Sequence, residues 1–175
     1  MRIISGKYKG KKILGDNIDG TRPTMDRVKE SLFGTIQNKI NDSICLDLFA
    51  GSGSLGIEAL SNGAQKCYFV DKNKIVIDVL KKNTNNVDNA LLIYSDYISA
   101  LKNFKENNIK FDIIFLDPPY RDNLINPSLA YIIDNDLINK DGIIICEYEN
   151  EDFSCDLDII KEKKYGSKYI RIYKN

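Results

Sequence analysis

Two short stretches of this sequence carry residues whose types and spacing could support chemistry. The first is AGSGSLGIEAL, in which Gly51, Gly53 and Gly56 have the spacing of loops that bind dinucleotides. Asp71 follows the first of these glycines by roughly twenty residues, where an acid that binds a ribose is expected. The second is DPPY, which begins at Asp117 directly after an apolar run. We expect both stretches to contribute to one ligand site.

The glycine loop by itself leaves two adenosine cofactors open, NAD and S-adenosylmethionine. Glycine lets the backbone approach a ligand, and the N–H groups of the helix that follows can bind an anion. Asp47 lies just before the loop, in LDLFAGSG. A carboxylate in this position does not help to bind a doubly anionic pyrophosphate, whereas it suits the sulfonium and ammonium groups of S-adenosylmethionine. Asp47 therefore favours S-adenosylmethionine over NAD.

Asp96 follows a third apolar run and has two interpretations. Its carboxylate could accept a hydrogen bond from the amine of an adenine. It could equally cap the helix expected after it, because Asp is a preferred N-cap residue.

The DPPY stretch places an acid, a carbonyl and an aromatic ring in one small volume. A strand end with a rigid turn is the purely structural interpretation, since Asp and Pro are common there. Two adjacent prolines, Pro118 and Pro119, also fix the backbone, so that Asp117 and a carbonyl form a preorganised pair of acceptors beside the stacking face of Tyr120. We expect this segment to be functional.

The elements that must position these residues alternate between strands and helices. Such alternation predicts a parallel sheet with helices on both faces, and a hairpin at the end of the sequence adds an antiparallel edge. Ligands bind such sheets at the carboxyl ends of the strands, which is where Gly51, Asp71, Asp96 and Asp117 fall. The strands are expected at 44–49, 67–70, 91–94, 111–116 and 143–148, and helices at 74–86, 97–105 and 127–138. A further helix opens just after the glycines and includes 57–60, and a final hairpin is expected around Gly166-Ser167.

The N-terminal part predicts a small basic β-hairpin, with strands at 3–4 and 12–14, followed by a loop that contains RPT. A helix is expected from Met25, so we divide the chain into an extension, 1–24, and a Rossmann-like domain, 25–175. The cations of the hairpin could bind the phosphates of RNA, or could simply be solvated. They are Arg2, Lys7, Lys9, Lys11 and Lys12.

Composition excludes several classes of function. The 175 residues suffice for one core, and 25 basic and 25 acidic side chains give no net charge. The absence of histidine excludes imidazole general bases and Ser-His-Asp triads. The four cysteines form no C-x-x-C pair, so we expect buried thiols and no metal. No apolar run would span a membrane or serve as a signal peptide, which predicts a cytoplasmic protein.

Three motifs in this order make the chain resemble a known family. RPTMDRVKESLF, LDLFAGSGSLGIEALSNGA and DPPY together are similar to the bacterial 16S ribosomal RNA guanine-N2 methyltransferases. The resemblance extends from RIISGKYKGKK to the final hairpin and is least distinctive after Glu147. It implies a seven-stranded Rossmann-like methyltransferase sheet, S-adenosylmethionine as the cofactor, and 16S rRNA in the small subunit or its precursor as the partner. We expect a monomer, although no residue pattern specifies the oligomeric state.

The resemblance also implies roles for individual residues. The catalytic segment would be Asp117, Pro118, Pro119 and Tyr120. The cofactor would be bound by Asp47, Phe49, Ala50, Gly51, Ser52, Gly53, Asp71, Lys72, Asp96 and Tyr97, with Arg22 and Thr24 of the RPT element nearby.

Three other functions remain open on the sequence. DPPY is shared with DNA or RNA methyltransferases that act on adenine N6 or cytosine N4, although 175 residues leave no separate domain for reading a duplex. The glycine loop with Asp71 would also fit an NAD-dependent oxidoreductase. A nucleic-acid-binding module without catalysis is a third alternative, which the intact Asp117 segment disfavours.

Overall fold

A computed structural model describes residues 1–15, 22–119, 122–149 and 152–175, with the side chains of 22–25 excepted. The elements in chain order are α1 (Arg22–Ile40), β1 (Ile44–Asp47), α2 (Ser54–Ser61), β2 (Lys66–Asp71), α3 (Lys74–Asn83), β3 (Ala90–Tyr94), α4 (Tyr97–Glu106), β4 (Phe111–Leu116), α5 (Ile125–Asp134), β5 (Ile138–Tyr148), β6 (Asp158–Tyr165) and β7 (Lys168–Lys174). Within the described residues, no helix is both long and apolar enough to cross a membrane.

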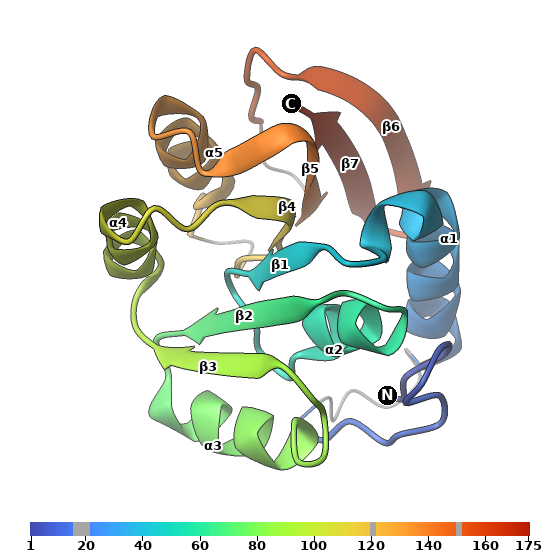
Figure 1. The fold of residues 1–175 in the computed structure, drawn as a ribbon. Coiled ribbons are helices and arrows are strands. Elements are labelled where there is room, and N and C mark those ends of the chain that lie inside the picture. Colours follow the sequence, from blue (N-terminus) through green and yellow to red (C-terminus); the bar gives the residue numbers. More distant parts are fainter. Residues whose placement is uncertain (16–21, 120–121, 150–151) are drawn as a thin grey trace.

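The strands form one seven-stranded sheet in the order β3-β2-β1-β4-β5-β7-β6 (Figure 1). The first five strands of this order pair in parallel, whereas β7 is antiparallel to both β5 and β6. The predicted fold class is therefore confirmed, including the antiparallel hairpin at the end of the sequence.

Helices cover both faces of the sheet because the central strands are apolar on both faces. Alternate residues of β4 show this. Ile113 and Phe115 belong to a core cluster with residues of α1, α2 and α3, whereas Ile114 and Leu116 pack in a second cluster with α4 and α5. All four side chains are at most 1% exposed. Figure 1 shows α1 and α2 on the opposite side of the sheet from α4 and α5.

Several predicted boundaries differ from the structure: β1 ends at Asp47, α3 ends at Asn83 and β5 begins at Ile138. The differences at α5 and α1 have identifiable causes. Helix α5 ends at Asp134 and not at Ile138, because Asp136 adopts a left-handed backbone (φ 54°) that ends the helix. Ile138 instead begins β5 and pairs with Phe111. Helix α1 begins at Arg22, so that the RPT element lies in its first turn and not in the expected loop.

The N-terminal segment packs against the domain as part of its core. In place of two strands it contains a single antiparallel bridge, between Arg2 and Lys12. Ile3 and Ile13 are buried in the cluster that contains α1 and α2. The carboxylate of Glu58, in α2, is fully buried and accepts hydrogen bonds from the backbone N–H groups of Ile4 and Ser5.

A buried cation completes this attachment. The Lys29 ammonium lies 3.2 Å from Glu58 and also donates to the Arg2 carbonyl at 2.5 Å. The segment is thus tied to α1 and α2 by a buried ion pair.

Candidate active site

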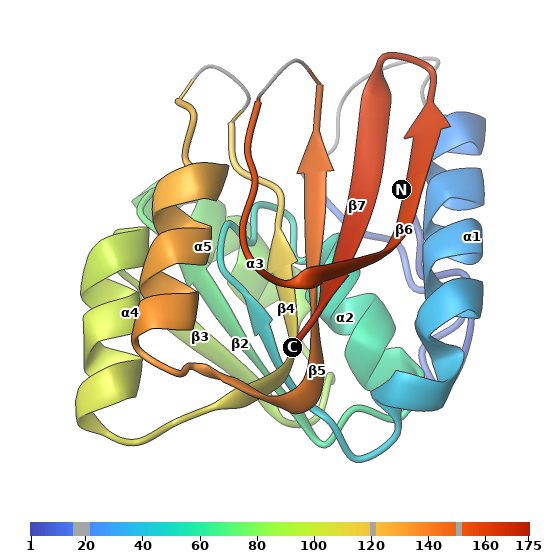
Figure 2. The same ribbon diagram turned by 90° about the horizontal axis from the view of Figure 1, so that it is seen from above.

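A cavity of about 960 Å³ lies at the edge of the sheet where the parallel strands end. Its walls come from the segments after β1, β2, β3 and β4, from α1 and from the turn between β6 and β7. Figure 2 shows this turn at the same end of the molecule as the ends of β4 and β5. Twelve of the predicted site residues line the cavity: Asp47, Phe49, Ala50, Gly51, Ser52, Asp71, Lys72, Asp96, Tyr97, Asp117, Pro118 and Pro119.

Asp71 ties the end of β2 to the glycine loop. Its Oδ2 accepts a hydrogen bond from the Gly51 N–H at 3.2 Å, and its Oδ1 accepts one from the Asn73 N–H at 2.8 Å. Gly51 itself has a left-handed backbone (φ 52°). Because each carboxylate oxygen can accept more than one hydrogen bond, Asp71 can hold the loop and bind a ligand hydroxyl together.

Gly53 does not line the cavity, although it was predicted to bind the cofactor. It precedes α2 in a left-handed conformation (φ 79°), and a Cβ built there would lie 2.3 Å from the Leu80 side chain. A Cβ at Gly56 would lie 2.3 Å from the ring of Phe69, on β2. These two glycines let the loop and helix pack closely on their neighbours, so their contribution to the site is indirect.

Asp47 is 2% exposed and lines the cavity from below the loop. Its Oδ2 accepts a hydrogen bond from the Gly56 N–H at 3.0 Å, so it also fixes the start of α2. Burial raises the pKa of Asp47 to about 7, and the neighbouring Asp71 adds to this rise while the Gly56 hydrogen bond opposes it. A cation bound in the cavity would favour the ionised form.

Asp96 is the N-cap of α4, as the structural interpretation expected. Its side chain accepts a hydrogen bond from the Ser99 N–H at 2.9 Å, and this bond lowers the pKa of Asp96. The residue is exposed and borders the cavity as well. Nearby, the rings of Phe49 and Tyr97 lie with centroids 5.7 Å apart and form an apolar part of the wall.

Asp117 and its two prolines line the cavity directly after β4. Pro118 is buried and Pro119 is exposed, so the segment turns from the core to the surface within two residues. Tyr120, which was predicted to supply a stacking face, lies outside the described residues. The Asp117 carboxylate is close enough to Lys168, on β7, to contribute to the raised pKa of that ammonium.

An ion pair that was not predicted from the sequence lines the same cavity. Glu147, at the end of β5, and Lys168, at the start of β7, both line it, and their charged atoms lie 2.6 Å apart. Glu147 could have been found by the rule that pointed to Asp117, since both follow an apolar run at the same edge. Lys168 could not have been found from the sequence, because no local motif predicts the strand order that brings β7 beside β5.

Carboxylates outnumber cations in the part of the cavity that the structure describes. Asp47, Asp71, Asp96, Asp117, Asp122 and Glu147 face three lysines, Lys29, Lys72 and Lys168. Such a cavity favours a cationic ligand over a dianionic pyrophosphate. This disfavours the NAD-dependent alternative. Among the described residues, no cluster of three or more Cys, Asp or Glu side chains could hold a metal ion.

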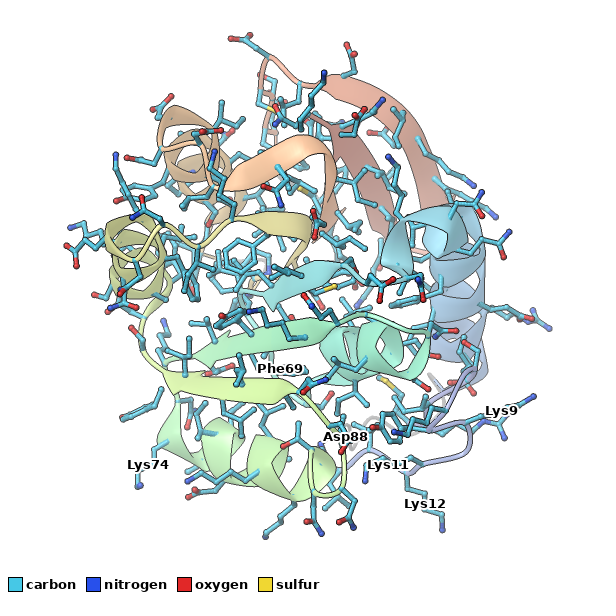
Figure 3. All side chains as sticks on the ribbon, in the orientation of Figure 1. Lys9, Lys11, Lys12, Phe69, Lys74 and Asp88 are labelled. Carbon is cyan, nitrogen blue, oxygen red and sulfur yellow. The ribbon has the colours of Figure 1, made fainter. Side chains whose placement is uncertain are left out.

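The lysines of the N-terminal segment do not line the cavity. The Lys7 ammonium is 2.7 Å from Asp88, and that of Lys11 is 2.8 Å from the Asn85 carbonyl. Both partners precede β3, so they lie at the edge of the sheet where the parallel strands begin. Figure 3 shows Lys9, Lys11 and Lys12 extending outward on this side of the molecule.

The side chains of Arg22 and Thr24 lie outside the described residues. The following part of α1 does reach the cavity, through Val28, Lys29 and Leu32. This helix therefore borders the site that the RPT element was predicted to approach.

Known proteins resemble this chain over its whole length. The family model described as "Conserved hypothetical protein 95" matches residues 1–174. The Ribosomal RNA small subunit methyltransferase D of Haemophilus influenzae is 38% identical over 182 residues, which cover 100% of this chain and 94% of the relative. The protein of the same name from Escherichia coli K12 is 34% identical, with coverage of 99% and 89%.

A solved structure shares the fold. The protein described as "Putative methyltransferase yhhF from Escherichia coli" superimposes with a TM-score of 0.85 at 31% identity. The match covers 100% of this chain and 97% of that one.

Proposed function

The chain belongs to the family described as Conserved hypothetical protein 95, together with the ribosomal RNA small subunit methyltransferases D, and from that we propose its reaction. It transfers a methyl group from S-adenosylmethionine to the exocyclic N2 amine of a guanine in 16S rRNA. The substrate is the small ribosomal subunit or its precursor. The single observation that carries this proposal is the acid-rich cavity that joins the glycine loop to Asp117.

The half of the cavity near β1 to β3 fits the cofactor. S-adenosylmethionine, when bound, supplies a methyl group on a positively charged sulfur. Asp71 would accept hydrogen bonds from the ribose hydroxyls, and Phe49 and Tyr97 would contact the adenine. The buried Asp47 would offset the positive charge of the ligand in a low-dielectric environment, where such an interaction is stronger than in water.

The half of the cavity near β4 fits the base. The lone pair of the guanine N2 amine is conjugated with the ring, which makes the amine a poor nucleophile. The Asp117 carboxylate and the Pro118 carbonyl would accept its two N–H bonds, which favours a pyramidal nitrogen with its lone pair directed at the methyl group. Positioning of this kind can lower a barrier by several kcal/mol, with an upper bound of roughly 7–11 kcal/mol.

The proton balance needs no strong base. The new C–N bond forms as the C–S bond breaks and the sulfur becomes neutral. The nitrogen, which then carries a positive charge, releases one proton to the Asp117 carboxylate and from there to solvent. This is compatible with a chain that contains no histidine.

The guanine must leave its stack to enter the cavity, at a cost of a few kcal/mol. Stacking on Tyr120 would return about 1–3 kcal/mol. The cations of the N-terminal segment would hold the RNA backbone at a distance from the target base, since they lie at the other edge of the sheet.

A methyl-transfer assay tests this reaction directly. Radiolabelled S-adenosylmethionine is offered with hypomethylated small subunits, with protein-free 16S rRNA and with duplex DNA, and the product nucleoside is identified by mass spectrometry. We expect N2-methylguanosine from subunits or rRNA. Transfer to DNA alone, or to adenine N6 or cytosine N4, would contradict the proposal and support the corresponding alternative.

A further inference from the structure

We infer that Glu147, held by Lys168, reads the target base and makes the enzyme select guanine over adenine and cytosine. This inference rests on the proposed function and assigns the choice of base to specific atoms. Its basis is the order in which three neighbouring strands bring charged groups to the cavity.

The strand register sets this order. Leu116 of β4 pairs with Cys146 of β5, so the next residues, Asp117 and Glu147, leave adjacent strands at the same level. On the other side of β5, Glu147 pairs with Ile170 of β7, two residues after Lys168. All three charged residues line the one cavity. Across the sheet the order is therefore carboxylate, carboxylate, ammonium.

The contact with Lys168 holds the Glu147 side chain in place. Its Oε1 lies 2.6 Å from the Lys168 ammonium, and its side chain is 15% exposed, against 37% for the lysine. Burial acts to lower the pKa of Lys168, yet the charges of Glu147 and Asp117 raise it overall, so the ammonium stays protonated. An ion pair that lines a cavity can form strong, directional hydrogen bonds with a ligand, because both of its groups are charged.

The edge of guanine has the complementary order. Its N2 amine and N1–H are donors and its O6 is an acceptor. With N2 bound at Asp117, the N1–H donates to the Glu147 carboxylate and O6 accepts from Lys168. A flipped base is read in this way, by hydrogen bonds to its Watson–Crick edge.

Adenine and cytosine present the wrong groups to Glu147. When either places its exocyclic amine at Asp117, the adjacent ring nitrogen is an acceptor and faces the carboxylate. Two acceptors then oppose each other, and the Glu147 oxygen that faces the base receives no hydrogen bond from it. A site that hydrogen-bonds one group of its substrate strongly rejects analogues without that group, because its own polar atoms are then left unpaired.

The test compares enzyme variants on two versions of one substrate. The methylated guanine is first located in hypomethylated small subunits by mass spectrometry, and subunits with adenine at that position are then prepared. Methyl transfer to both is measured for the unaltered enzyme and for Glu147→Gln, which keeps the shape of the side chain but removes the charge. Lys168→Met, which keeps the length of the stem, is a second variant.

We expect Glu147→Gln to lose about 10- to 100-fold in kcat/KM on guanine subunits, the effect of one hydrogen bond to a charged group. Its preference for guanine over adenine should fall by at least as much, because the glutamine amide can donate to the adenine ring nitrogen. Lys168→Met should reduce the preference less. Binding of S-adenosylhomocysteine, measured by calorimetry, should stay unchanged, which would show that the variants are folded.

Glu149→Gln is the matched control. Glu149 lies two residues further along, contacts Ser167 at 2.8 Å and adds to the charge around Lys168, but does not line the cavity. It should keep the preference of the unaltered enzyme. If Glu147→Gln also keeps that preference, the inference is wrong while the proposed function stands. If the unaltered enzyme does not methylate guanine, the proposed function fails and this inference with it.

Discussion

Asp47 combines two roles that the sequence could not separate. Its motif suggested a counter-charge for a cationic cofactor, and the structure adds a hydrogen bond to the Gly56 N–H that fixes the loop. Because burial raises its pKa to about 7, the residue changes charge in a range where the enzyme can be assayed. Its neighbour Asp71 is the other acid that acts on it.

Cofactor affinity should therefore depend on pH through Asp47. A cationic ligand binds better to the carboxylate than to the acid, so affinity should rise as the pH increases towards 7 and then level off. The slope below the pKa is at most tenfold per pH unit, roughly, for one proton. Calorimetry with S-adenosylmethionine between pH 5.5 and 7.5 measures this, since an α-amino group keeps its proton below about 7.7.

Asp47→Asn should show a flat profile over the same range, because the amide does not titrate and can still accept from Gly56. A variant profile as steep as that of the unaltered enzyme would assign the titration to another group of the cavity.

Asp117→Ala should nearly abolish methyl transfer. The side chain would no longer accept an N–H bond of the target amine, and loss of a positioned group of this kind costs about 100- to 10,000-fold in rate. Affinity for S-adenosylhomocysteine should change little, because we propose that Asp117 contacts the base and not the cofactor. A comparable loss of affinity would place Asp117 in the cofactor site instead.

At the scale of elements, the turn of the N-terminal segment fits against the end of α2 with no space for a side chain. Gly6 has φ 75°, and a Cβ there would lie 1.8 Å from the carbonyl oxygen of Ser61. Gly10, in the same turn, has φ 86° and open space around its Cβ position. The two glycines share a backbone conformation that strains other residues, and they differ in their surroundings.

This pair gives a matched test of how the segment is attached. Gly10→Ala should cost about 1–2 kcal/mol of unfolding free energy, the cost of a left-handed alanine. Gly6→Ala should cost a further 1–3 kcal/mol, roughly, because the backbone of Ser61 must move. Thermal or urea unfolding measures both variants, and equal losses would mean that the turn does not rest on α2.

Most elements could be predicted because their apolar runs are continuous and bounded by polar residues. Strand β4 has the bounds expected for it, Phe111–Leu116. The boundary between α5 and β5 could not be predicted, since it depends on the left-handed backbone of Asp136 and on a pairing of Ile138 with a distant strand. Local sequence patterns predict that a helix or strand is present better than they predict its ends, because the ends depend on pairing with distant residues.

At the scale of the whole molecule, Lys7 and Lys11 lie at the edge of the sheet opposite the cavity. If the RNA contacts both these lysines and the cavity, it must extend across the molecule.

Replacing Lys7, Lys9, Lys11 and Lys12 by Gln should weaken RNA binding and flatten its salt dependence by about one unit for each phosphate that the protein no longer binds. Transfer at saturating substrate should be unaffected, because none of these residues lines the cavity. Binding titrations over a range of salt concentrations measure this, and an unchanged slope would make the segment structural only.

The cofactor half of the site could be predicted more completely than the base half. Asp47, Gly51 and Asp71 belong to contiguous motifs whose geometry follows from a strand, a turn and a helix. Glu147 and Lys168 come together only because β7 inserts between β5 and β6, which is a property of the whole sheet. Short sequence motifs therefore indicate where the methyl donor binds, but they do not indicate which residues recognise the target base.

The turn between β6 and β7 has a consequence for how the enzyme is made. The residues proposed to bind the methyl donor lie within about the first hundred residues. The wall of the cavity that faces them includes residues of β7, which is synthesised after the other strands of the sheet. A chain that ends ahead of β7 lacks Lys168, and it also lacks Ile170 and Ile172, which are buried in the same core cluster as residues of α1 and α2. The complete cavity therefore requires β7, whose side chains contribute both to its wall and to the core beneath it.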